Sequence, residues 1–171
     1  MLRAAGGDTT AFDVIVRRHQ HRVQRFAIRM LGGNSAAGAD IAVGSFLRLW
    51  EHRATYRPCD KLGTWLIRTA YRLCLDSLGS RESAELGLER ASDATDSIEP
   101  QVHQRALALA VRDAIMELPE THRAVIILSA YEEMSYEAIG RALEIPAGTV
   151  ASRRNHAIDV LRRRLAAWEE Q

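Results

Sequence analysis

An acidic segment near the middle of the chain constrains how this sequence can fold. Residues 81–101 carry two arginines against six aspartates and glutamates, together with several serines and Pro100. This composition is typical of a loop, because it offers no continuous apolar face to bury. We therefore predict a flexible acidic linker over residues 81–101 that joins two small domains, residues 1–80 and residues 102–171.

On both sides of the expected linker, apolar residues recur at spacings of three and four, as in helices with one buried face. Helices are predicted from the capping residues Asp8–Thr10 to Gly32, from Ser35 to about His52, from about Leu62 to Leu78, over residues 102–117, and from Pro119 to about Tyr131. Residues 125–128 have the composition of a strand, but helical patterns flank them. The predicted fold class is all-α, with two small helical domains.

The overall composition excludes several classes of protein. The 171 residues carry a formal net charge of +1, and no apolar run approaches the roughly 18–20 residues that span a bilayer. The amino terminus lacks the apolar stretch of a signal peptide, which predicts a cytoplasmic protein. Cys59 and Cys74 are too few for a disulfide framework or a four-ligand zinc site. No residue spacing indicates catalysis, a metal or a cofactor, so we expect a protein that is not an enzyme.

The strongest local pattern lies between Met134 and Arg154. Ser135 is placed to cap a first helix, and Glu144-Ile145-Pro146 forms the expected turn. Ala138 is the small residue where the two helices are expected to come close. Pro146 suits the start of a second helix, because its missing N–H has no intrahelical partner to lose. This arrangement predicts a helix-turn-helix, whose second helix enters the major groove of DNA.

Side chains of that second helix are the candidates for reading DNA. Val150 is expected to face the core, so that its neighbours point outward. Arginine can bridge O6 and N7 of guanine, while threonine and serine suit bases or phosphates. The predicted DNA-contacting residues are Thr149, Ser152, Arg153, Arg154 and His156. The alternative is a helical hairpin that packs without contacting DNA.

Five motifs follow one another along the chain. They are Gly7-Asp8 with Phe12, Asp40 to Trp50, Trp65 to Asp76, Leu118 to Val125, and Ser135 to Arg153. Each motif is modest by itself, but together, in this order and spacing, they resemble one family. The chain is similar to the bacterial RNA polymerase sigma factors of the extracytoplasmic-function group.

The resemblance implies a promoter-specificity subunit with two binding domains. The N-terminal domain would hold the clamp helices of core RNA polymerase and open the −10 element, and the C-terminal helix-turn-helix would read the −35 element. The implied partners are core RNA polymerase, promoter DNA and an anti-sigma factor. The implied polymerase-binding residues are Asp40, Val43, Gly44, Leu47 and Trp50. The first four of these share one helix face, because they lie at i, i+3, i+4 and i+7.

Opening of the −10 element requires a surface that accepts unpaired bases by aromatic stacking and cationic contacts. Side chains with that chemistry gather around the loop before the third helix and along the helix itself. They are Tyr56, Arg57, Lys61, Trp65, Arg68 and Arg72. Trp65 has the alternative role of a core residue.

The chain departs from the family at Val43-Gly44, where a glutamine and a glutamate are usual. This difference keeps open a sigma-like decoy, which binds an anti-sigma factor but is poorly competent in transcription. A helix-turn-helix regulator that does not use the polymerase is a further alternative. The N-terminal motifs argue against that regulator, because it does not need them.

Overall fold

The computed structural model describes residues 2–56, 61–84 and 102–169. Over these ranges the ordered elements are helices, and no strand occurs among them. They are α1 (Leu2–Ala5), α2 (Thr9–Met30), α3 (Ser35–Glu51), α4 (Leu62–Ala84), α5 (Val102–Met116), α6 (Glu120–Ile126), η1 (Ile127–Tyr131), α7 (Tyr136–Leu143) and α8 (Ala147–Glu169). The all-α prediction is confirmed, and the strand-like residues 125–128 lie in α6 and in the π-helical turn η1.

Helix α2 begins and ends where the sequence predicts. The carboxylate of Asp8 accepts a hydrogen bond from the Ala11 N–H at 2.9 Å, which caps the first turn. The helix stops before Gly32 and Gly33, whose φ angles are +69° and +92°. These left-handed conformations favour glycine, which has no Cβ to clash with the backbone.

Two boundaries differ from the prediction. Asn34, not Ser35, caps α3, because its side chain accepts the Ala37 N–H at 2.9 Å. Helix α4 continues to Ala84, so the first four residues of the expected linker are helical. The rest of that linker, residues 85–101, lies outside the described residues.

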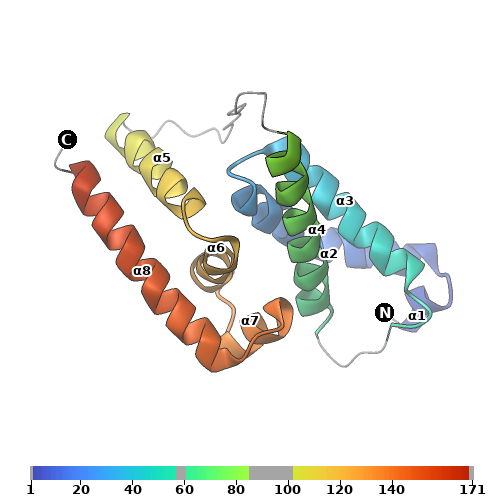
Figure 1. Ribbon diagram of the computed structural model, residues 1–171. Helices are drawn as coiled ribbons and strands as arrows, with labels where there is room; N and C mark the ends of the chain where they lie inside the picture. The colour runs from blue at the N-terminus through green and yellow to red at the C-terminus, as the bar shows by residue number, and fades with distance from the viewer. Residues whose placement is uncertain (1, 57–60, 85–101, 170–171) are drawn as a thin grey trace.

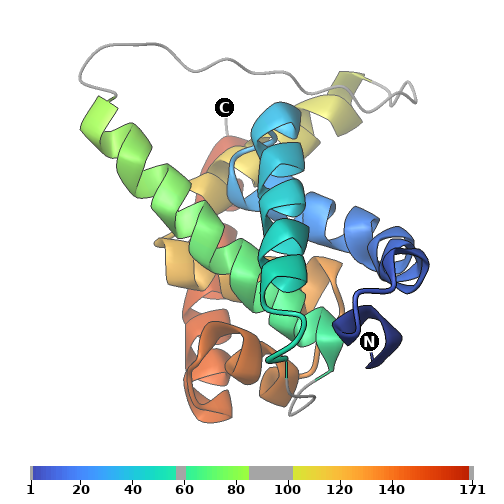
Figure 2. The same cartoon turned by 90° about the vertical axis from the view of Figure 1, so that its right-hand side faces the viewer.

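Two groups of helices build the molecule (Figure 1). Helices α2, α3 and α4 pack together in the N-terminal half, and α5, α6, α7 and α8 form the C-terminal half. The two halves also contact each other, since α4 lies beside α7 and α2 touches α6 and η1 (Figure 2). One apolar core continues through both halves. Its largest fully buried members include Phe26, Met30, Leu49, Leu66, Ile127, Leu128 and Ile139.

A buried arginine joins the two halves. Arg123 is 5% exposed, and its guanidinium donates a hydrogen bond to the carbonyl oxygen of Met30, at the end of α2, at 3.1 Å. The same guanidinium donates to the carbonyl oxygens of Met116 at 2.6 Å and Leu118 at 3.0 Å. Cations are favourable at the carboxyl ends of helices, where backbone carbonyls lack intrahelical partners. Arg123 therefore binds the ends of α2 and α5 to α6.

A second junction between the halves surrounds Glu132, whose side chain is 3% exposed. Its carboxylate pairs with three arginines of α2: Arg22 at 3.1 Å, Arg29 at 3.5 Å and Arg25 at 3.9 Å. The Arg29 guanidinium also lies 4.5 Å from the centre of the Tyr131 ring. These arginines lie off the apolar face of α2, and the carboxylate that pairs with them comes from the other half.

The turn of the helix-turn-helix depends on a glycine. A Cβ at Gly140 would lie 2.6 Å from the carbonyl oxygen of Ile145, too close for any side chain. The Ile145 N–H also donates to the Gly140 carbonyl oxygen at 2.9 Å. The close approach seen here is between Gly140 and the turn residue Ile145, and Ala138, where the sequence predicts that the two helices come close, is half-buried.

We predict that Gly140→Ala lowers the free energy of unfolding by about 1–3 kcal/mol, because the turn must shift to admit a methyl group. Gly148→Ala in α8 is the matched control, since a Cβ there meets nothing within 4 Å. The control should be neutral or stabilising by up to about 1 kcal/mol, from helix propensity. Urea unfolding followed by circular dichroism measures both. Equal effects of the two substitutions would contradict this account of the turn.

Candidate nucleic-acid and polymerase interfaces

The predicted helix-turn-helix is present as α7, its turn and the beginning of α8. Ser135 caps α7 by accepting a backbone N–H at 3.3 Å, as expected. Glu144 ends α7 in the left-handed conformation, with φ of 58°, and α8 starts directly after Pro146. Ile139 and Val150 are fully buried, so both helices contribute to the core. Val150 therefore faces inward, as predicted.

The five predicted DNA-contacting residues all lie near the beginning of α8. Ser152 and His156 are exposed, and Thr149, Arg153 and Arg154 are half-buried. The group combines hydroxyl, guanidinium and imidazole side chains on one short stretch of helix. Such groups can contact base edges and phosphates when a helix lies in the major groove.

A pair of histidines connects α8 to α6. The rings of His122 and His156 lie 5.4 Å apart at an angle of 64°. Burial lowers the pKa of His122, and the positive charges of His156 and Arg153 lower it further. The folded chain therefore favours the neutral form of His122.

The predicted −10 residues are divided between α4 and the loop before it. The Trp65 ring meets the Tyr56 ring edge-on, with centroids 6.1 Å apart. Trp65 is half-buried and packs against the apolar core, so it is in part the core residue of the alternative interpretation. Lys61 is exposed next to the first turn of α4, whereas Arg57 lies outside the described residues.

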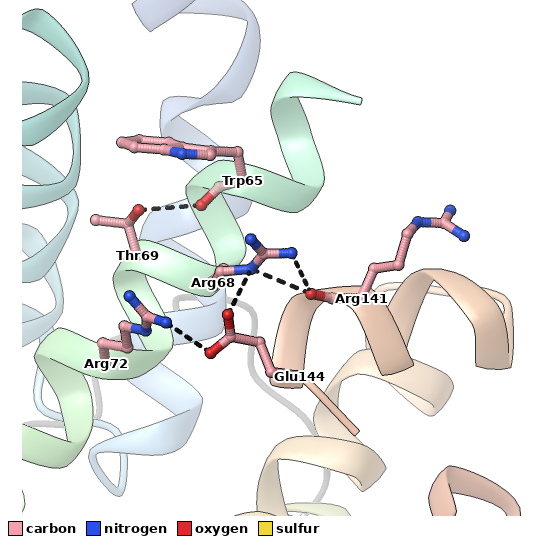
Figure 3. Close-up of polar contacts among 6 residues, drawn as sticks. All are labelled: Trp65, Arg68, Thr69, Arg72, Arg141 and Glu144. Carbon is pink, nitrogen blue, oxygen red and sulfur yellow. Dashed lines mark hydrogen bonds and ion pairs between the residues drawn. The ribbon is translucent and has the colours of Figure 1, made fainter. Parts of the chain in front are cut away.

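The other two −10 candidates, Arg68 and Arg72, point toward the helix-turn-helix (Figure 3). The Arg68 guanidinium donates to the carbonyl oxygen of Arg141 through Nη2 at 2.6 Å and Nε at 3.1 Å. Arg72 donates to the carboxylate of Glu144 at 2.6 Å. This hydrogen bond from Arg72, with the charges of both arginines, lowers the pKa of Glu144. No local sequence pattern predicts the contact, because the partners are 72 or 73 positions apart.

Helices α2 and α3 enclose an apolar groove with a volume of about 420 Å³. Its lining residues are Thr9, Phe12, Val16, Val43, Phe46, Leu47 and Trp50. Val43 and Leu47 are 59% and 57% exposed. Trp50 meets Phe12 edge-on at 4.9 Å, and Asp40 is exposed one turn before Val43.

The structure thus groups three of the five predicted polymerase-binding residues around one groove. Gly44 lies elsewhere, because a Cβ at this position would approach Leu73 of α4 to 3.3 Å. The glycine therefore allows close packing of α3 on α4. Phe12, Val16 and Phe46 were not predicted as part of this surface. The sequence signals for them were the apolar residues around much of the circumference of α3, for Phe46, and the apolar face of α2, for Phe12 and Val16.

Across the residues that the structure describes, no helix is long and apolar enough to cross a membrane. The same residues contain no cluster of three or more side chains that could hold a metal ion. Cys74 lies in the core, where burial raises its pKa to about 12.

Comparison with known proteins identifies two regions of one family along this chain. Residues 15–84 match the family described as Sigma-70 region 2, and residues 108–159 match Sigma-70, region 4. The ECF RNA polymerase sigma factor SigW of Bacillus subtilis is 32% identical, covering 93% of this chain and 91% of that protein. RNA polymerase sigma factor CarQ of Myxococcus xanthus is 30% identical, covering 99% of this chain and 97% of that protein.

Two solved structures share the fold at lower sequence identity. The sigma factor RpoE from Bartonella quintana, in complex with the anti-sigma factor NepR, has a TM-score of 0.74 at 18% identity. That match covers 91% of this chain and 97% of RpoE. CnrH, in complex with the cytosolic domain of CnrY, has a TM-score of 0.74 at 23% identity, covering 97% and 94% of the two chains.

The lowered pKa of His122 predicts a pH dependence of stability. Because the folded pKa lies below the unfolded value near 6.5, the stabilisation from neutral His122 is present above that pH. It is lost as the pH falls from about 6.5 toward the folded pKa. Urea unfolding at about pH 7.5 and about pH 5.5 should show a smaller loss for His122→Gln than for the wild type. Substitution of the exposed His21 by Gln is the control, and an equal change in both variants would contradict the prediction.

Proposed function

We infer what this protein does from one premise: the chain belongs to the sigma-70 family, and within it to the extracytoplasmic-function (ECF) sigma factors. It is a promoter-specificity subunit that binds core RNA polymerase and directs transcription initiation. The observation that carries this conclusion is the occurrence of region 2 and region 4, in that order, in one chain. A regulator that acts without the polymerase does not need region 2, so that alternative is set aside.

We propose that residues 1–80 bind the polymerase and the −10 element, and that residues 102–171 bind the −35 element. Residues 81–101 join the two. The three-helix packing of α2, α3 and α4 supports the first assignment, and the helix-turn-helix of α7 and α8 supports the second. The extension of α4 to Ala84 moves the beginning of the connecting segment to about residue 85.

We propose that Thr149, Ser152, Arg153, Arg154 and His156 contact the −35 element. Their position near the beginning of α8, directly after the turn, is where a recognition helix contacts base edges. For the −10 element we propose Tyr56, Arg57, Lys61, Trp65, Arg68 and Arg72. The half-buried Trp65 ring beside Tyr56, with cationic side chains along the same helix, supports that assignment.

We propose that the polymerase contacts α3 at the apolar groove, through Val43, Leu47 and Trp50, with Asp40 at its edge. Two large apolar side chains that are more than half exposed support this proposal, because such patches mark interaction sites. Gly44 contributes indirectly in this proposal, by holding α3 against α4. Where the family has a glutamine and a glutamate, this chain has Val43, which lines the groove, and Gly44, which packs against α4.

Three further proposals follow from family membership. The chain works without catalytic residues of its own, since sigma factors are specificity subunits and the chemistry belongs to the polymerase. It acts in the cytoplasm, where transcription takes place. An anti-sigma factor regulates it, as supported by the shared fold with RpoE, which binds NepR.

Reconstituted transcription tests the function. Core RNA polymerase mixed with this protein should initiate on genomic DNA of the same organism at sites that share two upstream elements, as mapped by the 5′ ends of the RNA. Core polymerase alone is the control and should not use these sites. A complex without new start sites would identify a decoy, and failure to form a complex would contradict the function.

We predict that Arg153→Ala reduces promoter binding by the polymerase complex by about 1–3 kcal/mol and relaxes the preference at one −35 base pair. The control is Arg162→Ala, further along α8, where the side chain is 77% exposed and pairs with Asp159. Binding to a panel of −35 variants distinguishes a contact to one base, which changes the preference at one base pair, from a contact to a phosphate. Uniform weakening on all sequences would make Arg153 a phosphate contact instead.

We predict that Leu47→Asp weakens binding to core polymerase about 10- to 100-fold, because a charge replaces roughly 1.5–3 kcal/mol of apolar contact. Val14→Asp is the matched control, since Val14 is 54% exposed on α2 and does not line the groove. Titration of labelled core polymerase measures both variants. Equal affinities of the two would show that the groove is not the polymerase contact.

A further inference from the structure

A histidine of α6 lies beside the face of α8 that is proposed to contact the −35 element. Helices α6 and α8 pack against each other (Figure 1), and the ring of His122 meets the ring of His156 with centroids 5.4 Å apart. Arg153 precedes His156 by one helical turn, so these two side chains share one face of α8. His122 therefore belongs to the same surface, although it lies outside the helix-turn-helix.

The two ring nitrogens of His122 have different surroundings. Nδ1 shares a hydrogen bond with the Thr121 hydroxyl at 3.4 Å, which orients the ring. Among the residues that the structure describes, Nε2 has no hydrogen-bond partner. A neutral imidazole donates from one nitrogen only, whereas a protonated imidazole donates from both. Protonation of His122 therefore adds both a donor and a positive charge to this surface.

In the free chain, the surroundings of His122 oppose its protonation. Burial lowers the pKa of this side chain, and the positive charges of His156 and Arg153 lower it further. Duplex DNA carries a dense row of phosphates, and a phosphate beside α8 offsets those two positive charges. A nearby negative charge also favours the protonated form of an imidazole directly. His122 is thus expected to bind a proton more tightly in a DNA complex than in the free chain.

The carboxylates near this surface have other partners. Glu120, in the first turn of α6, acts on Arg123 and on Tyr71 of α4. Burial raises the pKa of Tyr71, so its hydroxyl stays neutral. Asp159, further along α8, pairs with Arg162 at 3.7 Å. The positive charge of the histidine surface therefore remains available to an anion from outside the chain.

We propose that His122 is a further DNA-contacting residue of the −35 interface, and that it takes up a proton when the promoter binds beside His156 and Arg153. This proposal rests on the assignment of α8 to the −35 element. Proton binding and DNA binding are reciprocal, because each favours the state of the protein that the other favours. Promoter affinity therefore rises as the pH falls from about 8 to about 6.

The test measures binding of the complex of core polymerase and the full-length chain to a promoter duplex found by reconstituted transcription. Fluorescence anisotropy with a tetramethylrhodamine label is suitable, because this dye does not titrate between about pH 6 and about pH 8. The wild type should bind about three- to tenfold more tightly at the lower pH, since an opposite charge changes the proton affinity of a histidine by about tenfold. The logarithm of affinity should also fall more steeply with the logarithm of salt concentration at the lower pH, by about 0.9 for one added phosphate contact.

Two substitutions of His122 separate its charge from its packing. His122→Gln is neutral at both pH values, so the pH effect should fall to about twofold or less. His122→Lys is charged at both pH values, so it should bind more tightly than the wild type at about pH 8. Substitution of the exposed His21 on α2 by Gln is the matched control and should keep the wild-type pH effect. Circular dichroism verifies that each variant is folded at both pH values.

The outcomes distinguish this proposal from the proposed function. A wild-type pH effect that His122→Gln retains would overturn the proposal, because the proton then binds elsewhere. Weaker binding by folded His122→Lys than by the wild type at about pH 8 would also overturn it, since His122 would then act through packing alone. Equal binding of the wild type at both pH values would overturn it and leave the sigma function intact. If the complex does not bind the promoter at either pH, the proposed function fails, and this inference fails with it.

Discussion

The guanidinium of Arg123 is the contact on which the relation between the two halves depends. It is nearly fully buried and donates hydrogen bonds to carbonyl groups from the ends of two helices, one in each half. A buried cation without partners is very costly, whereas one that is bound by carbonyls at helix ends is stabilised. Separation of the halves removes its bond to Met30 and exposes this charge to water. The packing of the two halves therefore includes a specific contact, the buried Arg123 guanidinium.

Charge is distributed between the halves so as to favour this packing. In the ion pairs of the junction, the arginines lie on α2 and α4, and the carboxylates of Glu132 and Glu144 come from the C-terminal half. The formal net charge of +1 hides this arrangement, because the opposing charges cancel in the sum. The same arginines that suit a nucleic-acid backbone also suit these carboxylates. The ion pairs between the halves and the proposed DNA contacts thus use the same chemistry.

Much of the fold was predictable from the sequence, because local signals specify local structure. The cap at Asp8, the glycines after α2, the cap at Ser135 and the inward orientation of Val150 follow from neighbouring residues. Where a predicted helix boundary was wrong, the shift was small, as at the start of α3, which Asn34 caps in place of the neighbouring Ser35. Gly140 was missed because its role depends on the distance to Ile145 across the turn, which composition does not reveal.

The sequence by itself determined the helices, the helix-turn-helix and the resemblance to a family, since periodicity, caps and ordered motifs are properties of neighbouring residues. Only the tertiary structure decided which surfaces remain available. It placed Gly44 against Leu73, opened the groove at Val43 and Leu47, and set Glu144 on Arg72. The physical reason is that these contacts join residues far apart in the chain. Their geometry exists only after the halves pack, and no local pattern encodes it.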